Sequence, residues 1–151
     1  MKRSKFSTTL SLVFLLSSFV PLFFMDRLEG ARVPAHFNLA GVPDRWDGGT
    51  ALLLLPFIAS FIYVLMLMAG RWPQMINYPV WKSSKSTEQM HAVGVKYIAR
   101  YNVVVMMLFS YLANSSLMVA LGNWDKMPSG PLYVIVGAIV FLTVMFYRDV
   151  K

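Results

Sequence analysis

The residues best suited to chemistry lie in one short polar segment between two apolar runs, from Val33 to Asp47. An imidazole near carboxylates can bind a metal ion, contact a polar ligand, or hold a turn through hydrogen bonds. A catalytic zinc site usually takes three protein ligands and keeps one open position, whereas this segment has a single histidine. We therefore predict no metal and no other cofactor. Recognition of a ligand or partner stays open for four residues: His36, Asn38, Asp44 and Trp46.

The same segment carries three residues of a shaped turn, Pro34, Gly41 and Pro43. The prolines restrict the backbone, and Gly41 can adopt a positive φ angle at little cost. Pro43 followed by Asp44 favours a turn, and Asp and Asn side chains commonly bond their own backbone. We expect an ordered turn or a small β-hairpin, and a purely structural role for the polar residues is the alternative to recognition.

Enzyme activity would require a nucleophile and base, or paired carboxylates, that converge at one place. Asp44 and Asp47 beside His36 are the candidates, and they would make a membrane-surface hydrolase. The chain has no cysteine, which excludes thiol nucleophiles, disulfides and Cys-based zinc sites. We expect no catalytic residues and no enzyme.

Four apolar runs must position this segment. The chain is 57% hydrophobic and 14% charged, whereas soluble domains are about 45–50% apolar and about 25% charged. Each run is close to the roughly 20 residues that cross a bilayer as one helix. We predict an all-α membrane protein in which residues 1–151 form a single four-helix transmembrane domain. Its spans are residues 6–25, 51–69, 98–121 and 131–147, with an outer loop at 26–50 and a cytoplasmic connection at 70–97.

The basic residues predict the orientation in the cell membrane. Four of them fall on the side of the outer loop, namely Arg27, Arg32, Arg45 and Lys126, and the other ten fall on the opposite side. Cytoplasmic loops carry the excess of Lys and Arg, so we expect both termini in the cytoplasm. The net charge of +7 is explained by this distribution, and we predict no nucleic-acid partner.

Local signals add detail to the predicted helices. Ser86 and Gln89 fit a capping box, and a helix from Thr87 to Leu121 would be roughly 50 Å long, longer than the membrane is thick. The spans lack charged residues near their centres, which argues against a coupled transporter. Several polar side chains in the spans could bond between helices or line a polar cavity: Ser17, Ser18, Ser60, Asn114, Ser115 and Ser116.

The polar segment carries the pattern Pro34-x-His36-Phe37-Asn38, then Gly41 and Pro43-Asp44-x-Trp46, and the following span carries Pro56. This pattern resembles a bacterial membrane family, domain of unknown function 1648, which also forms the amino-terminal part of SdpI-type toxin-immunity proteins. A weaker resemblance runs from Asn77, Tyr78, Pro79 and Val80 through Glu88. Family members often carry Gly-Ser-Lys where this chain has Asp47, Gly48, Gly49 and Thr50, and four spans leave out the second half of SdpI-type proteins.

This resemblance implies a non-enzymatic protein that acts in recognition, immunity or signalling at the cell envelope. The outer loop from His36 to Trp46 would contact a peptide or protein, and the cytoplasmic connection would contact a cytoplasmic protein. An accessory subunit of a membrane transporter is the alternative. The oligomeric state stays open, and the lipid bilayer is the one partner that composition itself predicts.

The orientation can be tested with single cysteines, since the chain has none of its own. We expect cysteines at Ser4 and Ser83 to be shielded from an impermeant thiol reagent in intact cells, and a cysteine at Ala40 to be labelled, because short basic loops stay in the cytoplasm. Labelling at Ser83 in sealed cells would contradict the orientation.

Overall fold

The computed structural model describes residues 5–75 and 85–151, and the resemblance at 77–80 and the labelling positions Ser4 and Ser83 lie outside them. Four stretches of the described residues are long and apolar enough to cross a membrane: Lys5–Leu28, Gly49–Arg71, Thr87–Ala120 and Ser129–Val150. A two-stranded antiparallel β-hairpin lies between the first two. The prediction of four helical spans with a hairpin after the first is confirmed.

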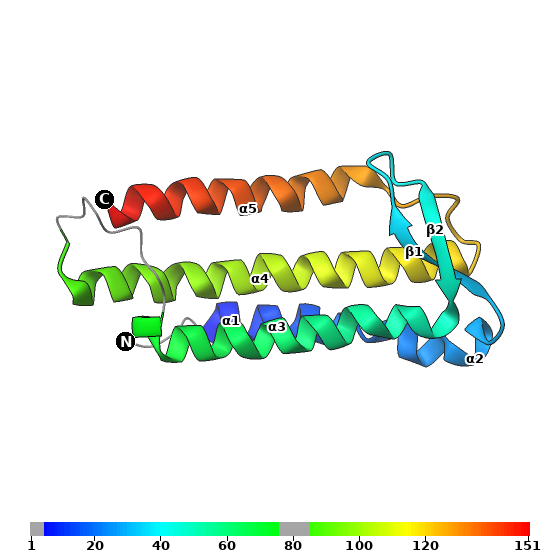
Figure 1. The fold of residues 1–151 in the computed structure, drawn as a ribbon, viewed down its shortest axis with the longest axis horizontal. Helices are drawn as coiled ribbons and strands as arrows, with labels where there is room; N and C mark the ends of the chain where they lie inside the picture. The colour runs from blue at the N-terminus through cyan, green and yellow to red at the C-terminus, as the bar shows by residue number, and fades with distance from the viewer. Residues whose placement is uncertain (1–4, 76–84) are drawn as a thin grey trace.

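The elements follow one another as an up-and-down bundle (Figure 1). In chain order they are α1 (Lys5–Ser17), the 3-10 helix η1 (Val20–Phe24), α2 (Met25–Leu28), β1 (Arg32–Phe37), β2 (Pro43–Gly48), η2 (Gly49–Leu53), α3 (Leu54–Arg71), η3 (Pro73–Met75), α4 (Thr87–Ala120) and α5 (Ser129–Val150). Residues 26–50, predicted as the outer loop, thus include most of α2, both strands and the start of η2. The predicted connection at 70–97 includes the first turns of α4.

Helix α4 is the centre of the bundle, with α1 and α3 on one side and α5 on the other (Figure 1). It begins at a capping box, in which the Ser86 hydroxyl accepts from the Gln89 N–H and the Gln89 side chain accepts from the Ser86 N–H, as predicted. At its other end Gly122 has φ 72°, a conformation that closes helices without a Cβ penalty. At 34 residues the helix is about 51 Å long.

Two apolar clusters hold the bundle. One joins α1, α3 and α4 through Leu15, Ala59, Tyr63 and Met106. The other lies beneath the hairpin and joins Leu28, Val33, Leu52 and Leu117. Since the second cluster includes a strand residue, the hairpin is packed onto the bundle through apolar contact as well as through the chain connections at its two ends.

The first candidate span, Lys5–Leu28, covers the predicted residues 6–25, but it is not one continuous α-helix, because α1 ends at Ser17 and the 3-10 helix η1 begins at Val20. Pro21 has no N–H, and the carbonyl it would have bonded in a helix is that of Ser17, where α1 ends. Asn114 on α4 fills the vacancy, because its Nδ2 donates to the Ser17 carbonyl at 3.0 Å and to the Ser110 carbonyl at 2.8 Å. Asn114 thus links α1 to α4, as helix packing predicts, and it also lines a largely apolar cavity between α1, α4 and α5.

Polar contacts tie α5 to α4 near both of its ends. At the end away from the hairpin, the Tyr97 hydroxyl donates to Asp149 at 2.8 Å, Lys96 pairs with Asp149 at 3.1 Å, and the Tyr101 hydroxyl bonds Thr143 at 2.8 Å. At the hairpin end, the Tyr111 hydroxyl donates to the Pro128 carbonyl. Helices α3 and α5 each pack against α4 rather than against each other.

The Asn114 contact makes a prediction about stability. We expect Asn114→Ala to lower the free energy of unfolding by at least about 0.6 kcal/mol, the average for a hydrogen bond between membrane helices, and by more where the Ser17 carbonyl is left without a partner. Asn123→Ala, an exposed change after the same helix, is the control and should have little effect. Thermal melting in detergent measures both.

A double substitution tests the cause. Pro21→Ala restores the N–H that can bond the Ser17 carbonyl. Asn114→Ala should therefore lower the free energy of unfolding less in the Pro21→Ala protein than in the parent. Equal costs in the two backgrounds would contradict the role assigned to Pro21.

Candidate ligand-binding site

The hairpin gets its shape from Asn38 and Gly41. The Asn38 side-chain oxygen accepts from the Ala40 and Val42 N–H groups, both at 3.0 Å, and the backbone of Asn38 bonds that of Gly41 and Val42. Gly41 has φ 79°, the left-handed conformation anticipated from the sequence. Both the side-chain oxygen and the backbone carbonyl of Asn38 accept hydrogen bonds within the turn. Asn38, which was predicted as a recognition residue, thus has a structural role.

The turn is also fastened to the other connection at the same end of the bundle. The Met127 N–H donates to the Gly41 carbonyl at 2.9 Å, and the Tyr133 hydroxyl of α5 donates to the Leu39 carbonyl at 2.6 Å. A Cβ at Gly41 would lie 1.9 Å from the Met127 carbonyl oxygen. Close backbone contact and a positive φ angle thus both require glycine at this position.

The strands place the remaining predicted residues. Pro34 lies inside β1, where it is buried and pairs with Trp46, so its placement in the turn is corrected. Pro43 opens β2 opposite Phe37. Trp46 lies in β2 and is 39% exposed, an arrangement common for aromatic residues at membrane interfaces.

His36 and Asp44 meet across the hairpin. The His36 Nδ1 lies 2.6 Å from the Asp44 Oδ1, with 63% of the His36 side chain and 44% of the Asp44 side chain exposed. Such an exposed pair adds at most about 1 kcal/mol to stability. Other side chains also shape the hairpin, since Asn38 bonds the backbone of the turn and Val33 is packed in the apolar cluster beneath it.

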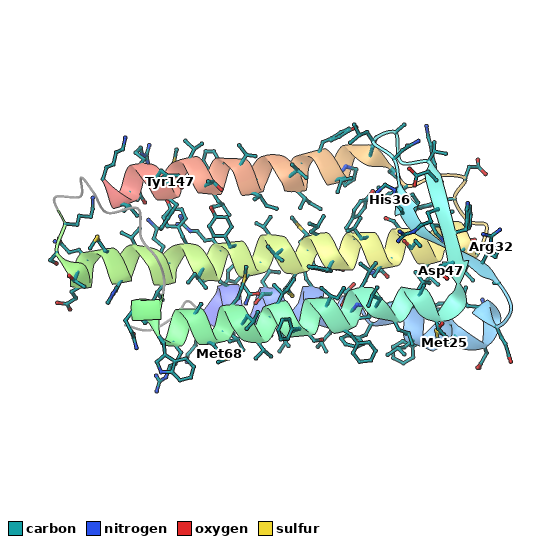
Figure 2. All side chains as sticks on the ribbon, viewed as in Figure 1. Met25, Arg32, His36, Asp47, Met68 and Tyr147 are labelled. Atoms are coloured by element: carbon teal, nitrogen blue, oxygen red, sulfur yellow. The ribbon has the colours of Figure 1, made fainter. Side chains whose placement is uncertain are left out.

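Beneath the hairpin lies a cavity of about 420 Å³, a size typical of small-molecule sites. Its floor is apolar and is made by α3, α4 and α5: Leu54, Leu55, Leu108, Leu112, Leu132 and Val136. Its polar lining includes His36, Arg45 and Asp47 of the hairpin. Figure 2 shows His36 and Asp47 at the end of the bundle that the hairpin covers, opposite the end that carries Met68 and Tyr147.

Arg45 and Asp47 share one face of β2, because they lie two residues apart and side chains alternate along a strand. His36 pairs with Arg45 at an irregular point of the ladder, with register shifts on both sides of it, and its ring bonds Asp44. Within residues 5–75 and 85–151, the Arg45 guanidinium and the Asp47 carboxylate have no ion-pair partner. Among the described residues, the Asp47 carboxylate accepts only from the neighbouring Gly48 N–H, at 2.8 Å. Two opposite charges thus face the cavity and remain available to an occupant.

Sequence reasoning missed Arg45 and the leucines of the cavity floor. The spacing of Arg45 and Asp47 was a signal of a shared strand face, once a hairpin was expected. No sequence pattern predicted the cavity floor, because its leucines cannot be distinguished in the sequence from the leucines of a membrane span that face lipid. Among the described residues, no group of three His, Cys, Asp or Glu side chains could hold a metal ion.

The described residues include four helices long and apolar enough to span a membrane, so the chain is a small multi-pass membrane protein. Residues 12–60 match the family model described as Domain of unknown function (DUF1648). This range includes the whole hairpin and Pro56, so the predicted resemblance to that family is confirmed there. No curated protein and no solved structure matches the chain.

The contacts of Gly41 predict a steep cost for any side chain there. Gly41→Val should lower the melting temperature and the yield of folded protein, since a left-handed residue alone costs about 1–2 kcal/mol and the added Cβ would strike the Met127 carbonyl. Gly48→Val is the matched control, because its Cβ would meet no atom within 4 Å. Gly48→Val and His36→Ala should both melt close to the parent. A Gly41→Val protein as stable as these two would refute the close packing of the turn.

Proposed function

We propose that this protein is a non-enzymatic component of the cell membrane that recognises an amphiphilic ligand at its outer face, in the cavity beneath the hairpin. The observation that carries the proposal is the lining of that cavity, in which a charged hairpin face lies above an apolar floor. Sites for small molecules are mostly apolar and carry a few placed polar groups. Recognition is the step common to the immunity and signalling roles that the family resemblance implies.

The proposed orientation of the protein decides from which side of the membrane the ligand reaches the cavity. The start of α1 and the end of α5 lie at one end of the bundle, and the hairpin lies at the other (Figure 1). The excess of basic residues on the termini side supports a cytoplasmic location for that end. The hairpin would then face outward, with its cavity at the outer boundary of the bilayer.

A hydrolase is the second candidate, and one observation favours it. Asp44 bonds the Nδ1 of His36, which would leave Nε2 as the proton acceptor in the way that general bases use. Within the described part of the chain, however, no hydroxyl group is bonded to His36, and a nucleophile beside the base is the usual arrangement. We therefore place recognition first.

Blocking the cavity tests the proposal. Native mass spectrometry of the protein released from cell membranes should detect a bound amphiphilic molecule in the parent. Leu112→Trp should lose it, because the larger ring fills the cavity floor. Leu65→Trp, on the exposed surface of α3, is the control and should keep it. Equal retention in both variants, with both folded, would refute a ligand in this cavity.

Substitutions of the His36–Asp44 pair provide a second test of the proposed function. His36→Ala and Asp44→Ala should weaken retention while the melting temperature stays near that of the parent, because the pair is exposed. Parallel loss of stability and retention would make the pair structural instead. Appearance of a cleaved ligand that depends on His36 would favour the hydrolase.

A further inference from the structure

The polar lining of the cavity has a charge pattern that restricts its occupant. Arg45 and Asp47 lie on one strand face, about 6–7 Å apart along the strand at the usual rise per residue. Neither has an ion-pair partner among the described residues. Arg presents a fork of donors that matches phosphate oxygens, and a carboxylate accepts from an ammonium group. An occupant with both groups, a short spacer apart, would satisfy both side chains.

The net charge at the hairpin end of the molecule also favours an occupant with one positive and one negative group. The segments at residues 25–50 and 121–130 contain four basic and five acidic residues. A site for anionic headgroups would normally present an excess of positive charge, and this end has none. An occupant without net charge therefore fits better than an anion.

The lower part of the cavity fits a hydrocarbon chain. Its floor consists of leucine and valine side chains from three candidate membrane spans. These residues come from α3, α4 and α5, and α3 and α5 each pack mainly on α4. An acyl chain from the bilayer could lie there without burying any polar group.

Resting on the proposed function, we infer that the ligand is a zwitterionic phospholipid with a primary ammonium group. Its phosphate binds Arg45, its ammonium binds Asp47, and one acyl chain lies on the floor around Leu112. His36 stays bonded to Asp44 at the edge of the headgroup.

Two phospholipids that have identical acyl chains and differ only in the headgroup test this assignment. The full-length protein, purified and freed of lipid, is mixed with equal amounts of dioleoyl phosphatidylethanolamine or dioleoyl phosphatidylglycerol, and bound lipid is counted by native mass spectrometry. We expect the ethanolamine lipid to be retained in preference. Glycerophosphoethanolamine, which has the headgroup without chains, should not compete, because the floor contributes to binding.

Charge variants assign the two contacts. Asp47→Asn should reduce the preference for ethanolamine over glycerol about two- to fivefold, the range that an exposed ion pair supports, and Arg45→Gln should lower retention of both lipids by a similar factor. Asp125→Asn and Lys126→Gln make the same charge changes at the same end but outside the cavity lining, so both should behave as the parent.

Three results would overturn the inference: glycerol lipid retained as well as ethanolamine lipid, charge variants indistinguishable from their controls, or full competition by glycerophosphoethanolamine. None of them affects the loss of the native ligand on Leu112→Trp. The lipid assignment can therefore fail while the cavity remains a binding site, and failure of the cavity test would remove both.

Discussion

The hydrogen bond from Asn114 to the Ser17 carbonyl sets the path of the first third of the chain. Pro21 removes the donor that would have served this carbonyl, and a backbone group without a partner costs several kcal/mol in hydrocarbon. Asn114 supplies the donor from α4, so α1 must end beside that helix. The chain then continues through η1 and α2 to Leu28, which is buried with residues of β1, η2 and α4. The hairpin that follows is packed on the bundle through Val33 of the same cluster.

A second constraint fixes the far side of the hairpin. The turn contacts the α4–α5 connection through backbone atoms, with Gly41 against Met127, and α5 itself through the Tyr133 hydroxyl. Backbone contacts at this distance leave little room for the hairpin to shift. A rigid hairpin holds Arg45 and Asp47 at a constant spacing above the cavity, which is what selection between headgroups requires.

The cavity exists because α5 is attached differently from the other helices. Helices α1 and α3 share an apolar cluster with α4, whereas α5 is joined to α4 by polar contacts near its ends, at Tyr97, Tyr101 and Tyr111. Between these contacts its valine and phenylalanine side chains remain largely exposed. In water such a surface would drive closer packing, but lipid is as apolar as the side chains, so α5 can leave this surface uncovered.

The sequence by itself determined the number of spans, the capping box of α4 and the turn at Gly41. Each depends on local physics: bilayer thickness sets the length of an apolar run, and caps and turns involve residues a few positions apart. Even the proximity of His36 and Asp44 follows from a short hairpin, although Pro34 belongs to a strand rather than to the turn.

Only the tertiary structure decided the partner of the Ser17 carbonyl, the contact of Gly41 with Met127 and the cavity floor. Asn114 is 97 positions from Ser17 in the chain, and many polar residues in the spans were equally eligible as partners. The leucines of the floor come from three helices, and which face of each is turned inward depends on packing, since lipid imposes no polar face to reveal it. A site assembled from distant apolar residues leaves no local pattern, so its binding surface becomes visible only when the helices are placed together.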